Sequence, residues 1–280
     1  MHKTYIKLLR LSQWIKNLLL LFPPFFAGSI FNNSLMENGF PALLAFCLAA
    51  SCSYIINDIK DIESDRNHDG KKNRSIASGE ISVSTAISVA AILFFLALYI
   101  SFQVSTNFFL YIIAYLLISA SYTYFFKEIV ILDIFIISAG FIVRVLAGGE
   151  AFGVPVSNWL FMTVFMVSLF LASGKRMGEL VSLGKDAHTH RKSLSSYSLS
   201  FLEGVLWFSA SSALVMYSLY TLEHRSRLFY TVPLAAFGLL RFIYIAKEGK
   251  GDPTEVLLGD RQVMGVGIVW FLVICFVTYT

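Results

Sequence analysis

The sequence predicts an all-α membrane protein with nine transmembrane helices, on three observations. Hydrophobic residues make up 56% of the 280-residue chain and charged residues only 14%, whereas soluble domains carry about a quarter charged residues. The mean hydropathy is +0.69. Apolar runs of near-spanning length recur along the whole chain, and no polar stretch suggests a separate soluble domain. We therefore expect a single integral membrane domain over residues 1–280.

Each predicted helix is an apolar run that meets or approaches the roughly 20 residues needed to cross a bilayer. In order, the runs cover residues 14–31, 40–57, 83–103, 107–124, 129–147, 157–173, 200–221, 228–246 and 262–279. The first run follows a basic segment, as a signal peptide does. However, the run is long and has no obvious small-residue cleavage site, so we expect a retained helix.

The distribution of positive charge predicts the orientation in the membrane. Of the 22 Lys and Arg residues, all but Arg144, Arg225, Arg227 and Arg241 lie in the N-terminal segment or in alternate loops. The positive-inside rule then predicts a cytoplasmic N-terminus, a C-terminus outside and all acidic clusters at the cytoplasmic face of the inner membrane. The net charge of +4 reflects this topology and an affinity for phosphate, so no nucleic-acid partner is expected.

Familiar soluble-enzyme motifs are absent from the sequence. We find no Walker loop, dinucleotide fingerprint, zinc-protease motif or nucleophile elbow. Cys47, Cys52 and Cys275 lie in or at the ends of apolar runs without metal-ligand spacing, so we expect them to pack between helices.

The stretch NDIKDIESD ends the second apolar run with three aspartates. On a continuing helix, Asn57, Asp58, Asp61 and Asp65 would share one face, where neighbouring carboxylates repel each other. Mg²⁺ relieves such repulsion, because it prefers oxygen ligands and commonly bridges one or two carboxylates to substrate phosphates. We therefore expect the three aspartates to be catalytic residues that bind Mg²⁺, with Asn57 adding an oxygen or a hydrogen bond. The alternative is a solvated helix end.

Basic residues follow this acidic stretch directly. Lys71 and Arg74 are expected to contact substrate phosphates, because ammonium and guanidinium groups are the usual phosphate donors. Lys72 fits phosphate contact and plain positive-inside charge equally well. His68 is a ligand, a base or an ordinary turn residue. Carboxylates with a metal and nearby cations suit a diphosphate that carries Mg²⁺.

Two further groups of polar residues lie at the same membrane face. After the sixth run, SGKRMGEL offers Lys175, Arg176 and Glu179, which we expect to bind substrate across a cavity from the aspartates. An ion pair between Lys175 and Glu179 is the alternative. Downstream, Arg191, Lys192 and Tyr197 are expected to contribute to a lid.

Near the start of the chain, RLSQWIKN brings Gln13, Lys16 and Asn17 together as a compact polar set for a lipid phosphate. Trp14 is expected to anchor the chain at the interface. Within the runs, Asp133, Arg144 and Arg241 are expected to pair or to face a cavity.

Together these residues resemble the UbiA superfamily of intramembrane prenyltransferases, and within it decaprenyl-phosphate phosphoribosyltransferases. The resemblance rests on QWIKN (13–17), NDIKDIESDRNHDGKKNRSIASG (57–79), DIFIISAGFIVRVLAGG (133–149) and GKRMGEL (174–180). It extends over nearly the whole chain. Leu11 and Ser75 stand where the family usually has proline, and neither replaces a proposed metal ligand.

The resemblance implies a nine-helix bundle around a lateral, lipid-accessible cavity. It also implies Mg²⁺-dependent transfer of 5-phosphoribose from phosphoribosyl diphosphate to a polyprenyl phosphate of the decaprenyl type, for cell-wall biosynthesis. Lys71, Arg74, Lys175 and Arg176 would hold the phosphates of the donor. The acceptor is already an anion, so no strong general base is needed.

Two other functions stay open at this point. A prenyltransferase that moves a prenyl group from its diphosphate to an aromatic or other acceptor would use the same metal site, but the second aspartate-rich motif typical of such enzymes is missing. A lipid-phosphate transporter would carry matched charged or broken helices near the membrane midplane, and the charges here crowd one face instead. The chain length of the lipid and the oligomeric state do not follow from the sequence.

Overall fold

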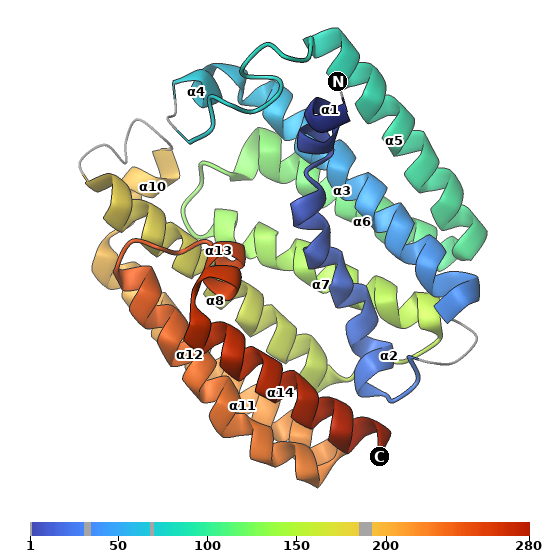
Figure 1. Cartoon of the computed structure of the whole chain (residues 1–280), viewed down its shortest axis with the longest axis vertical. Coiled ribbons are helices and arrows are strands. Elements are labelled where there is room, and N and C mark those ends of the chain that lie inside the picture. Colours follow the sequence, from blue (N-terminus) through green and yellow to red (C-terminus); the bar gives the residue numbers. More distant parts are fainter. Residues whose placement is uncertain (1, 31–34, 68–69, 185–191) are drawn as a thin grey trace. The chain divides into compact units, whose positions relative to one another are not determined.

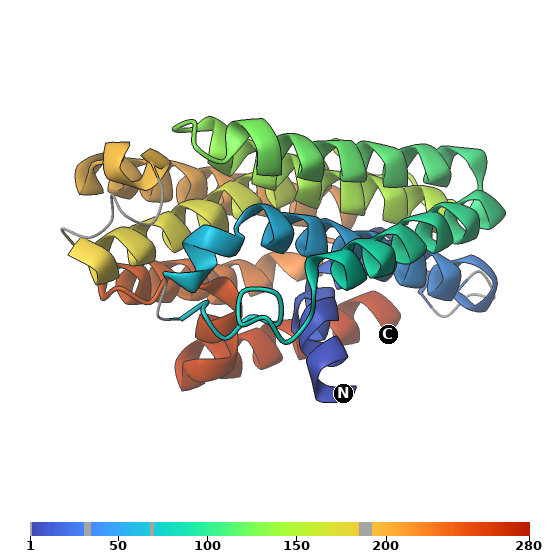
Figure 2. The ribbon, with the colours of Figure 1, turned by 90° about the horizontal axis from the view of Figure 1, so that it is seen from above.

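The computed structural model describes residues 2–30, 35–67, 70–184 and 192–280. Within these residues the chain forms helices and turns without any strand, as Figures 1 and 2 show. The contacts divide the chain into two compact units. Unit 1 comprises Met1–Phe125 and Val143–Pro155, and unit 2 comprises Phe126–Ile142 and Val156–Thr280. The all-α fold predicted from the sequence is confirmed.

Unit 1 is built around a long helix, α3, which packs against α5 and α6. Its elements are α1 (His2–Leu9), the 3-10 helix η1 (Leu11–Leu21), α2 (Phe22–Phe26), η2 (Leu35–Gly39), α3 (Phe40–Lys60), α4 (Ile62–Arg66), α5 (Val83–Val104), α6 (Thr106–Ser121) and η3 (Tyr122–Phe126), together with the C-terminal part of α7 (Leu132–Phe152). Figures 1 and 2 show α3 and α5 side by side.

Unit 2 is built around the packed pair α8 and α11. Its elements are the N-terminal part of α7, α8 (Asn158–Leu183), α10 (Lys192–Ser196), α11 (Leu199–His224), η5 (Ser226–Thr231), α12 (Val232–Lys247), α13 (Pro253–Gly259) and α14 (Arg261–Tyr279).

Polar caps fix where the long helices begin. The hydroxyls of Ser82, Ser105, Ser157 and Ser198 each accept a hydrogen bond from the backbone N–H of the third residue after them. Each bond satisfies one of the backbone N–H groups that the first turn of a helix leaves without a partner. A serine therefore begins α5, α6, α8 and α11.

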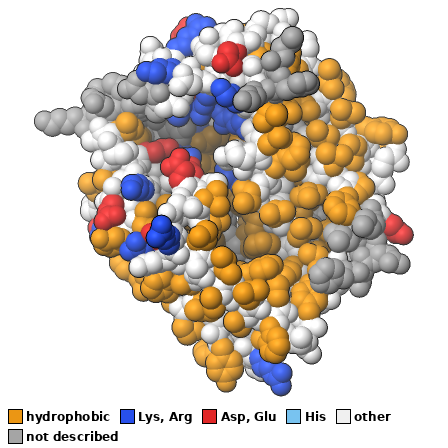
Figure 3. Space-filling view, in the orientation of Figure 1, with side chains coloured by type: hydrophobic (Ala, Val, Ile, Leu, Met, Phe, Trp, Pro, Cys, Tyr) orange, Lys and Arg blue, Asp and Glu red, His pale blue; other side chains and the backbone are white. Residues whose placement is uncertain are grey.

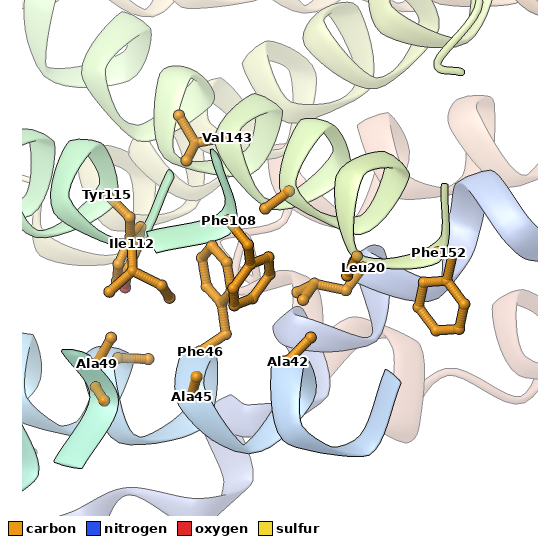
Figure 4. Close-up of a cluster of buried hydrophobic side chains, with 14 residues drawn as sticks. Leu20, Ala42, Ala45, Phe46, Ala49, Phe108, Ile112, Tyr115, Val143 and Phe152 are labelled. Atoms are coloured by element: carbon orange, nitrogen blue, oxygen red, sulfur yellow. The ribbon is translucent and has the colours of Figure 1, made fainter. Parts of the chain in front are cut away.

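The core of unit 1 is a dense apolar cluster, drawn in Figure 4. Phe46 of α3 meets Phe108 of α6 edge to face, with ring centroids 5.8 Å apart. Gly148 lets α7 approach η1 closely, because a Cβ atom there would lie 2.1 Å from the carbonyl oxygen of Leu20. Small residues allow this kind of close helix packing in membrane proteins.

The described residues contain eight helices long and apolar enough to cross a membrane. They are Glu37–Lys60, Val83–Val104, Thr106–Phe126, Leu132–Phe152, Asn158–Leu183, Leu199–His224, Ser226–Lys247 and Arg261–Tyr279. These coincide with eight of the nine predicted spans. Large apolar side chains such as Phe95 and Leu117 are exposed, and hydrophobic side chains cover broad areas of the surface in Figure 3. The chain is an integral, multi-pass membrane protein.

The remaining predicted span, residues 14–31, has a different local structure. η1 occupies its start and α2 follows, with Pro23 and Pro24 in the first turn of α2. A 3-10 helix rises about 2.0 Å per residue, against about 1.5 Å for an α-helix. The 11 residues of η1 and the five of α2 therefore reach about 30 Å, which is roughly the thickness of the hydrocarbon core.

Candidate active site

The acidic motif lies where α3 ends and α4 begins. Asp58 is in the last turn of α3, Asp61 stands between the two helices with φ −98° and ψ 10°, and Asp65 is in α4. The predicted single helix face is therefore interrupted at Asp61. Asp58 and Asp65 are nevertheless both buried, with 5% and 3% of their surface exposed. Two buried carboxylates at a membrane interface are a costly arrangement unless cations balance them.

Arg74 supplies one of these cations and brings the two carboxylates together. Its Nη1 atom donates to Asp58 Oδ1 at 3.1 Å and to Asp65 Oδ2 at 2.6 Å. The loop after α4 carries Arg74 back over the end of α3, and the carbonyl of Lys71 accepts from the Arg74 backbone N–H. This geometry places Arg74 beside the carboxylates, and the predicted contact of Arg74 with a substrate phosphate stays a prediction.

Arg10 is a second cation that the sequence analysis did not assign to the site. Its Nη2 atom donates to the same Asp58 Oδ1 atom that Arg74 contacts. The guanidinium also lies over the ring of Tyr54, 5.3 Å from its centroid. Arg10 belongs to the basic segment RLSQWIKN, and the predicted position of this segment at the cytoplasmic interface was the available signal. No feature of the sequence indicated that Arg10 pairs with Asp58, which lies 48 residues away along the chain.

Asp61 has a different partner from the other two aspartates. The Asn57 amide donates to Asp61 Oδ2 at 3.2 Å, and the Thr123 hydroxyl donates to Asn57 Oδ1 at 3.4 Å. Of the two roles expected for Asn57, the hydrogen bond is the one observed. Thr123 lies in the π-helical turn η3 and was not identified from the sequence.

The acidic side chains at this site offer two neighbouring carboxylates to a divalent cation. In the part of the chain that the structure describes, no three acidic, His or Cys side chains gather as a metal-binding group. Asp58 and Asp65, however, both lie within hydrogen-bonding distance of one Arg74 nitrogen. Mg²⁺ commonly uses one or two carboxylates and completes its shell with water and substrate phosphates. These two side chains suit that mode, with Asp61 close by in sequence.

The N-terminal polar set divides between two faces of η1. A 3-10 helix has three residues per turn, so Gln13 and Lys16 share one face and Trp14 and Asn17 share another. Trp14 Nε1 donates to Ser51 Oγ at 2.9 Å. Asn17 is fully buried, and its Oδ1 accepts from Arg144 Nε at 2.9 Å. Gln13 and Lys16 are half-buried. Asn17 thus holds Arg144 in the core of unit 1 and is not grouped with Gln13 and Lys16.

In unit 2, Arg176 is buried in a polar network. Its Nε donates to Asp133 Oδ2 at 2.7 Å and its Nη1 to Glu179 Oε2 at 2.8 Å. The Tyr197 hydroxyl donates to Asp133 Oδ1 at 2.6 Å and accepts from the backbone N–H of Ile131 at 2.7 Å. Burial and the bond to Asp133 raise the pKa of Tyr197 above its ordinary value. The fully buried Asp133 therefore joins Arg176 to Tyr197, and Arg176 in turn holds Glu179.

Lys175 points to another partner, so the alternative pair with Glu179 is not formed. Its Nζ lies 2.8 Å from Asp252 Oδ2, at the N-terminus of α13. Burial acts to raise the pKa of Asp252, but Lys175 and the capped backbone N–H groups of Thr254 and Glu255 hold it below its ordinary value. Lys175 is 42% exposed and remains accessible to a solute.

Glycines on α8 make the Lys175–Asp252 pairing possible. A Cβ atom at Gly178 would lie 2.3 Å from the backbone nitrogen of Gly251, and one at Gly251 would lie 2.1 Å from the carbonyl oxygen of Gly174. The loop before α13 therefore rests directly on the α8 backbone. This contact explains Gly178 of the GKRMGEL motif, whereas Gly174 leaves room for the ring of Phe242, which would lie 2.2 Å from a Cβ atom placed there.

The other predicted residues lie in the loop after α4 or in and beside the segments outside the described residues. Lys71 is half-buried and Lys72 is exposed in the loop that carries Arg74. His68 and Arg191 lie outside the described residues, and so does the side chain of Lys192. The predicted approach of the Lys175–Glu179 segment to the aspartates stays a prediction, because these residues belong to different units.

Comparison with known proteins identifies the family of this chain. The family model described as the UbiA prenyltransferase family matches residues 21–258. The chain belongs to this family. The predicted resemblance of the chain to the UbiA superfamily is thereby confirmed, and the chain is a transferase by family.

Curated relatives cover nearly all of the chain. Decaprenyl-phosphate phosphoribosyltransferase of Mycolicibacterium smegmatis is 35% identical over 283 residues, which are 95% of this chain and 89% of the relative. The protein of that name from Corynebacterium glutamicum is 34% identical over 287 residues, 98% of this chain and 86% of the relative.

Solved UbiA structures share the fold at lower identity. A UbiA homologue from Archaeoglobus fulgidus bound to DMAPP and Mg²⁺ superposes with a TM-score of 0.78 at 20% identity, over 99% of both chains. The same homologue bound to GPP and Mg²⁺ gives a TM-score of 0.77 at 21% identity, again over 99% of both chains. The UbiA helical fold predicted for this chain is therefore confirmed.

Proposed function

We propose that this UbiA-family protein transfers 5-phosphoribose from phosphoribosyl diphosphate to a polyprenyl phosphate of the decaprenyl type. The observation that carries the proposal is the pair of buried carboxylates, Asp58 and Asp65, joined by Arg74 at the end of a membrane helix. The site combines oxygen ligands for a hard cation with a guanidinium for phosphate. The relatives named above support the choice of donor and acceptor.

The proposed reaction is a substitution at C1 of the ribose. A phosphate oxygen of the acceptor forms the new bond to C1, and the bond between C1 and the diphosphate oxygen breaks, so that diphosphate leaves with the bonding electrons. When bound, Mg²⁺ supplies positive charge that neutralises this leaving group. The acceptor phosphate is an anion already, and no general base has to remove a proton from it.

The residues of this chain would bind and align the two substrates. Asp58, Asp61 and Asp65 would hold Mg²⁺, and Arg74 with Lys71 would contact the diphosphate of the donor. Lys175 is a further phosphate contact, because its ammonium is accessible. Gln13 and Lys16 are proposed to contact the acceptor phosphate. Alignment of bound reactants can lower the barrier by several kcal/mol.

Other assigned residues act through their neighbours in this proposal. Arg176, Glu179 and Tyr197 are held in the Asp133 network, and they would position the α8 segment that carries Lys175. Asn57 orients Asp61, and Asn17 orients Arg144. We further propose that the site faces the cytoplasm, with the N-terminus inside and the C-terminus outside, since most Lys and Arg lie in the N-terminal segment and the alternate loops that the positive-inside rule assigns to that side.

The test is a transfer assay with defined substrates. Purified protein is incubated with Mg²⁺, phosphoribosyl diphosphate and a panel of polyprenyl phosphates, and the lipids are analysed by mass spectrometry. A lipid-linked ribose 5-phosphate that requires Mg²⁺ is the expected product. Product formed only from a prenyl diphosphate and an aromatic acceptor would overturn the proposal in favour of prenyl transfer. Movement of polyprenyl phosphate across vesicles without any new covalent product would favour a transporter.

A further inference from the structure

Arg10 stands in an unusual place for a residue of the N-terminal segment. It lies between α1 and η1 with φ 51° and ψ 50°, a left-handed conformation that residues other than glycine adopt at an energetic cost. This backbone geometry carries its guanidinium to Asp58 and over Tyr54, one helical turn before Asp58 on α3. The side chain keeps 20% of its surface exposed.

Asp58 Oδ1 therefore accepts from two guanidinium groups at once. Arg10 and Arg74 both contact this one oxygen, and Arg74 also contacts Asp65. Two positive charges against the carboxylates oppose the approach of a bare divalent cation. They favour the approach of an anion, because a guanidinium has five N–H donors and can hold a carboxylate and a phosphate together.

We propose that Arg10 is a diphosphate-binding residue that couples diphosphate binding to metal binding. It neutralises Asp58 when no diphosphate is bound, and it contacts the diphosphate when one is bound, which leaves Asp58 to the metal. Metal and diphosphate then bind with positive cooperativity, and the coupling is reciprocal. The inference rests on the proposed function, because the donor proposed there carries a diphosphate.

The experiment measures binding without any turnover. The affinity of the purified full-length chain for Mn²⁺ alone, and for inorganic pyrophosphate in the presence of Mn²⁺, is measured by calorimetry and by Mn²⁺ paramagnetic resonance. Mn²⁺ replaces Mg²⁺ as the probe because both prefer oxygen ligands. In the native protein we expect weak binding of Mn²⁺ alone and tighter binding with pyrophosphate.

The Arg10→Gln variant separates the two effects by their signs. Removal of the guanidinium should leave the affinity for Mn²⁺ alone unchanged or raise it, since a repelling charge is lost. It should lower the affinity for pyrophosphate with Mn²⁺ by about tenfold or more, the usual effect of losing one charged hydrogen bond. Lys7→Gln removes a charge from the exposed face of α1 and should change neither affinity.

A second variant covers the case in which Arg10→Gln does not fold. Arg10→Lys keeps the charge but loses the planar fork, so we expect weak Mn²⁺ binding as in the native protein and reduced pyrophosphate affinity. An equal loss of both affinities in either variant would mean that Arg10 only shapes Asp58 and would overturn the proposal. Unchanged pyrophosphate affinity would overturn it as well.

The outcome is distinguishable from failure of the proposed function. The binding measurement uses neither phosphoribosyl diphosphate nor a polyprenyl phosphate. Cooperative binding of Mn²⁺ and pyrophosphate that depends on Arg10, with no lipid-linked ribose 5-phosphate formed, would reject the proposed substrates alone. If the native protein forms that product and Arg10→Gln keeps the native affinity for pyrophosphate, only the coupling is rejected.

Discussion

The three aspartates at the end of α3 differ in what they contact and hence in what their removal does. Asp58 and Asp65 are buried against arginines, so a change at either one also disturbs the local fold. Asp61 is half-buried, and the structure gives it a hydrogen bond from Asn57. Asp61 is therefore the position at which a loss of metal binding can be measured with the least loss of stability.

We expect Asp61→Ala to lower turnover by about 10²-fold or more, the scale of losing one electrostatic contact to a leaving group. Membrane insertion and the melting temperature should change little. Initial rates of product formation and thermal unfolding in detergent give the two readouts. Glu63→Ala removes an exposed acid from the same segment and should retain activity. Near-normal turnover of Asp61→Ala would remove its metal role.

In unit 2, the effect of removing Asp133 likewise depends on the side chains that it contacts. It is fully buried between Arg176 and Tyr197, and its loss leaves the Arg176 guanidinium buried without its main counter-charge. Breaking a buried pair typically costs about 3–5 kcal/mol, whereas loss of a hydrogen bond costs about 1 kcal/mol, and the Tyr197 hydroxyl makes two.

We therefore predict that Asp133→Asn strongly lowers the melting temperature and that Tyr197→Phe lowers it by less. Thermal unfolding of the two purified variants in one detergent checks this order. If Asp133→Asn melts at the native temperature, the buried ion pair does not stabilise unit 2.

At the scale of elements, glycines determine how closely the loop before α13 packs on α8. Gly178 and Gly251 let the backbone before α13 touch the helix, and this contact places Asp252 beside Lys175. At Gly178, any side chain larger than hydrogen has to push the loop away, since the nearest atoms belong to backbone and have no rotamer to change.

Gly178→Ala is expected to destabilise the protein by about 1–3 kcal/mol, as overpacking does, and to reduce turnover by moving Asp252 away from Lys175. Gly204→Ala, on α11, is the matched control. No atom lies within 4 Å of a Cβ placed there, and alanine favours a helix over glycine. Its melting temperature should equal or exceed that of the native protein. Equal melting temperatures for Gly178→Ala and the native chain would show that the loop shifts freely.

For the whole molecule, the main consequence of the charge pattern is orientation. Lys and Arg gather in the loops after α3, α6, α8 and α12, whereas the turn between α11 and η5 carries Arg225 and Arg227. If η1 and α2 form the first crossing, nine crossings place the two termini on opposite sides.

Cysteine labelling in intact cells tests this orientation. Both Lys72 and Arg227 are exposed, in loops predicted to lie on opposite sides. Arg227→Cys should react with a membrane-impermeant maleimide in intact cells, and Lys72→Cys only after the cells are permeabilised. The native chain, with Cys47 and Cys52 buried, gives the background. The reverse pattern would invert the proposed topology.

Much of the fold could be predicted because it depends on properties that the sequence shows directly. Eight of the nine predicted spans correspond to helices of spanning length, since apolar runs bounded by charge report lipid contact. The acidic motif, Arg74 and the GKRMGEL segment were identified because charges are rare in such a chain. The 3-10 geometry of η1 was not predicted, and it separates Asn17 from Gln13 and Lys16.

The sequence by itself determined the class of protein, the approximate positions of the membrane helices and the loops that carry charge. Only the tertiary structure decided the partners: Arg10 and Arg74 on Asp58, Asn17 on Arg144, and Asp133 between Arg176 and Tyr197. The physical reason is that hydropathy and charge belong to each residue, whereas an ion pair requires two side chains to meet. Residues 48 or 127 positions apart meet only when helices pack in one particular way.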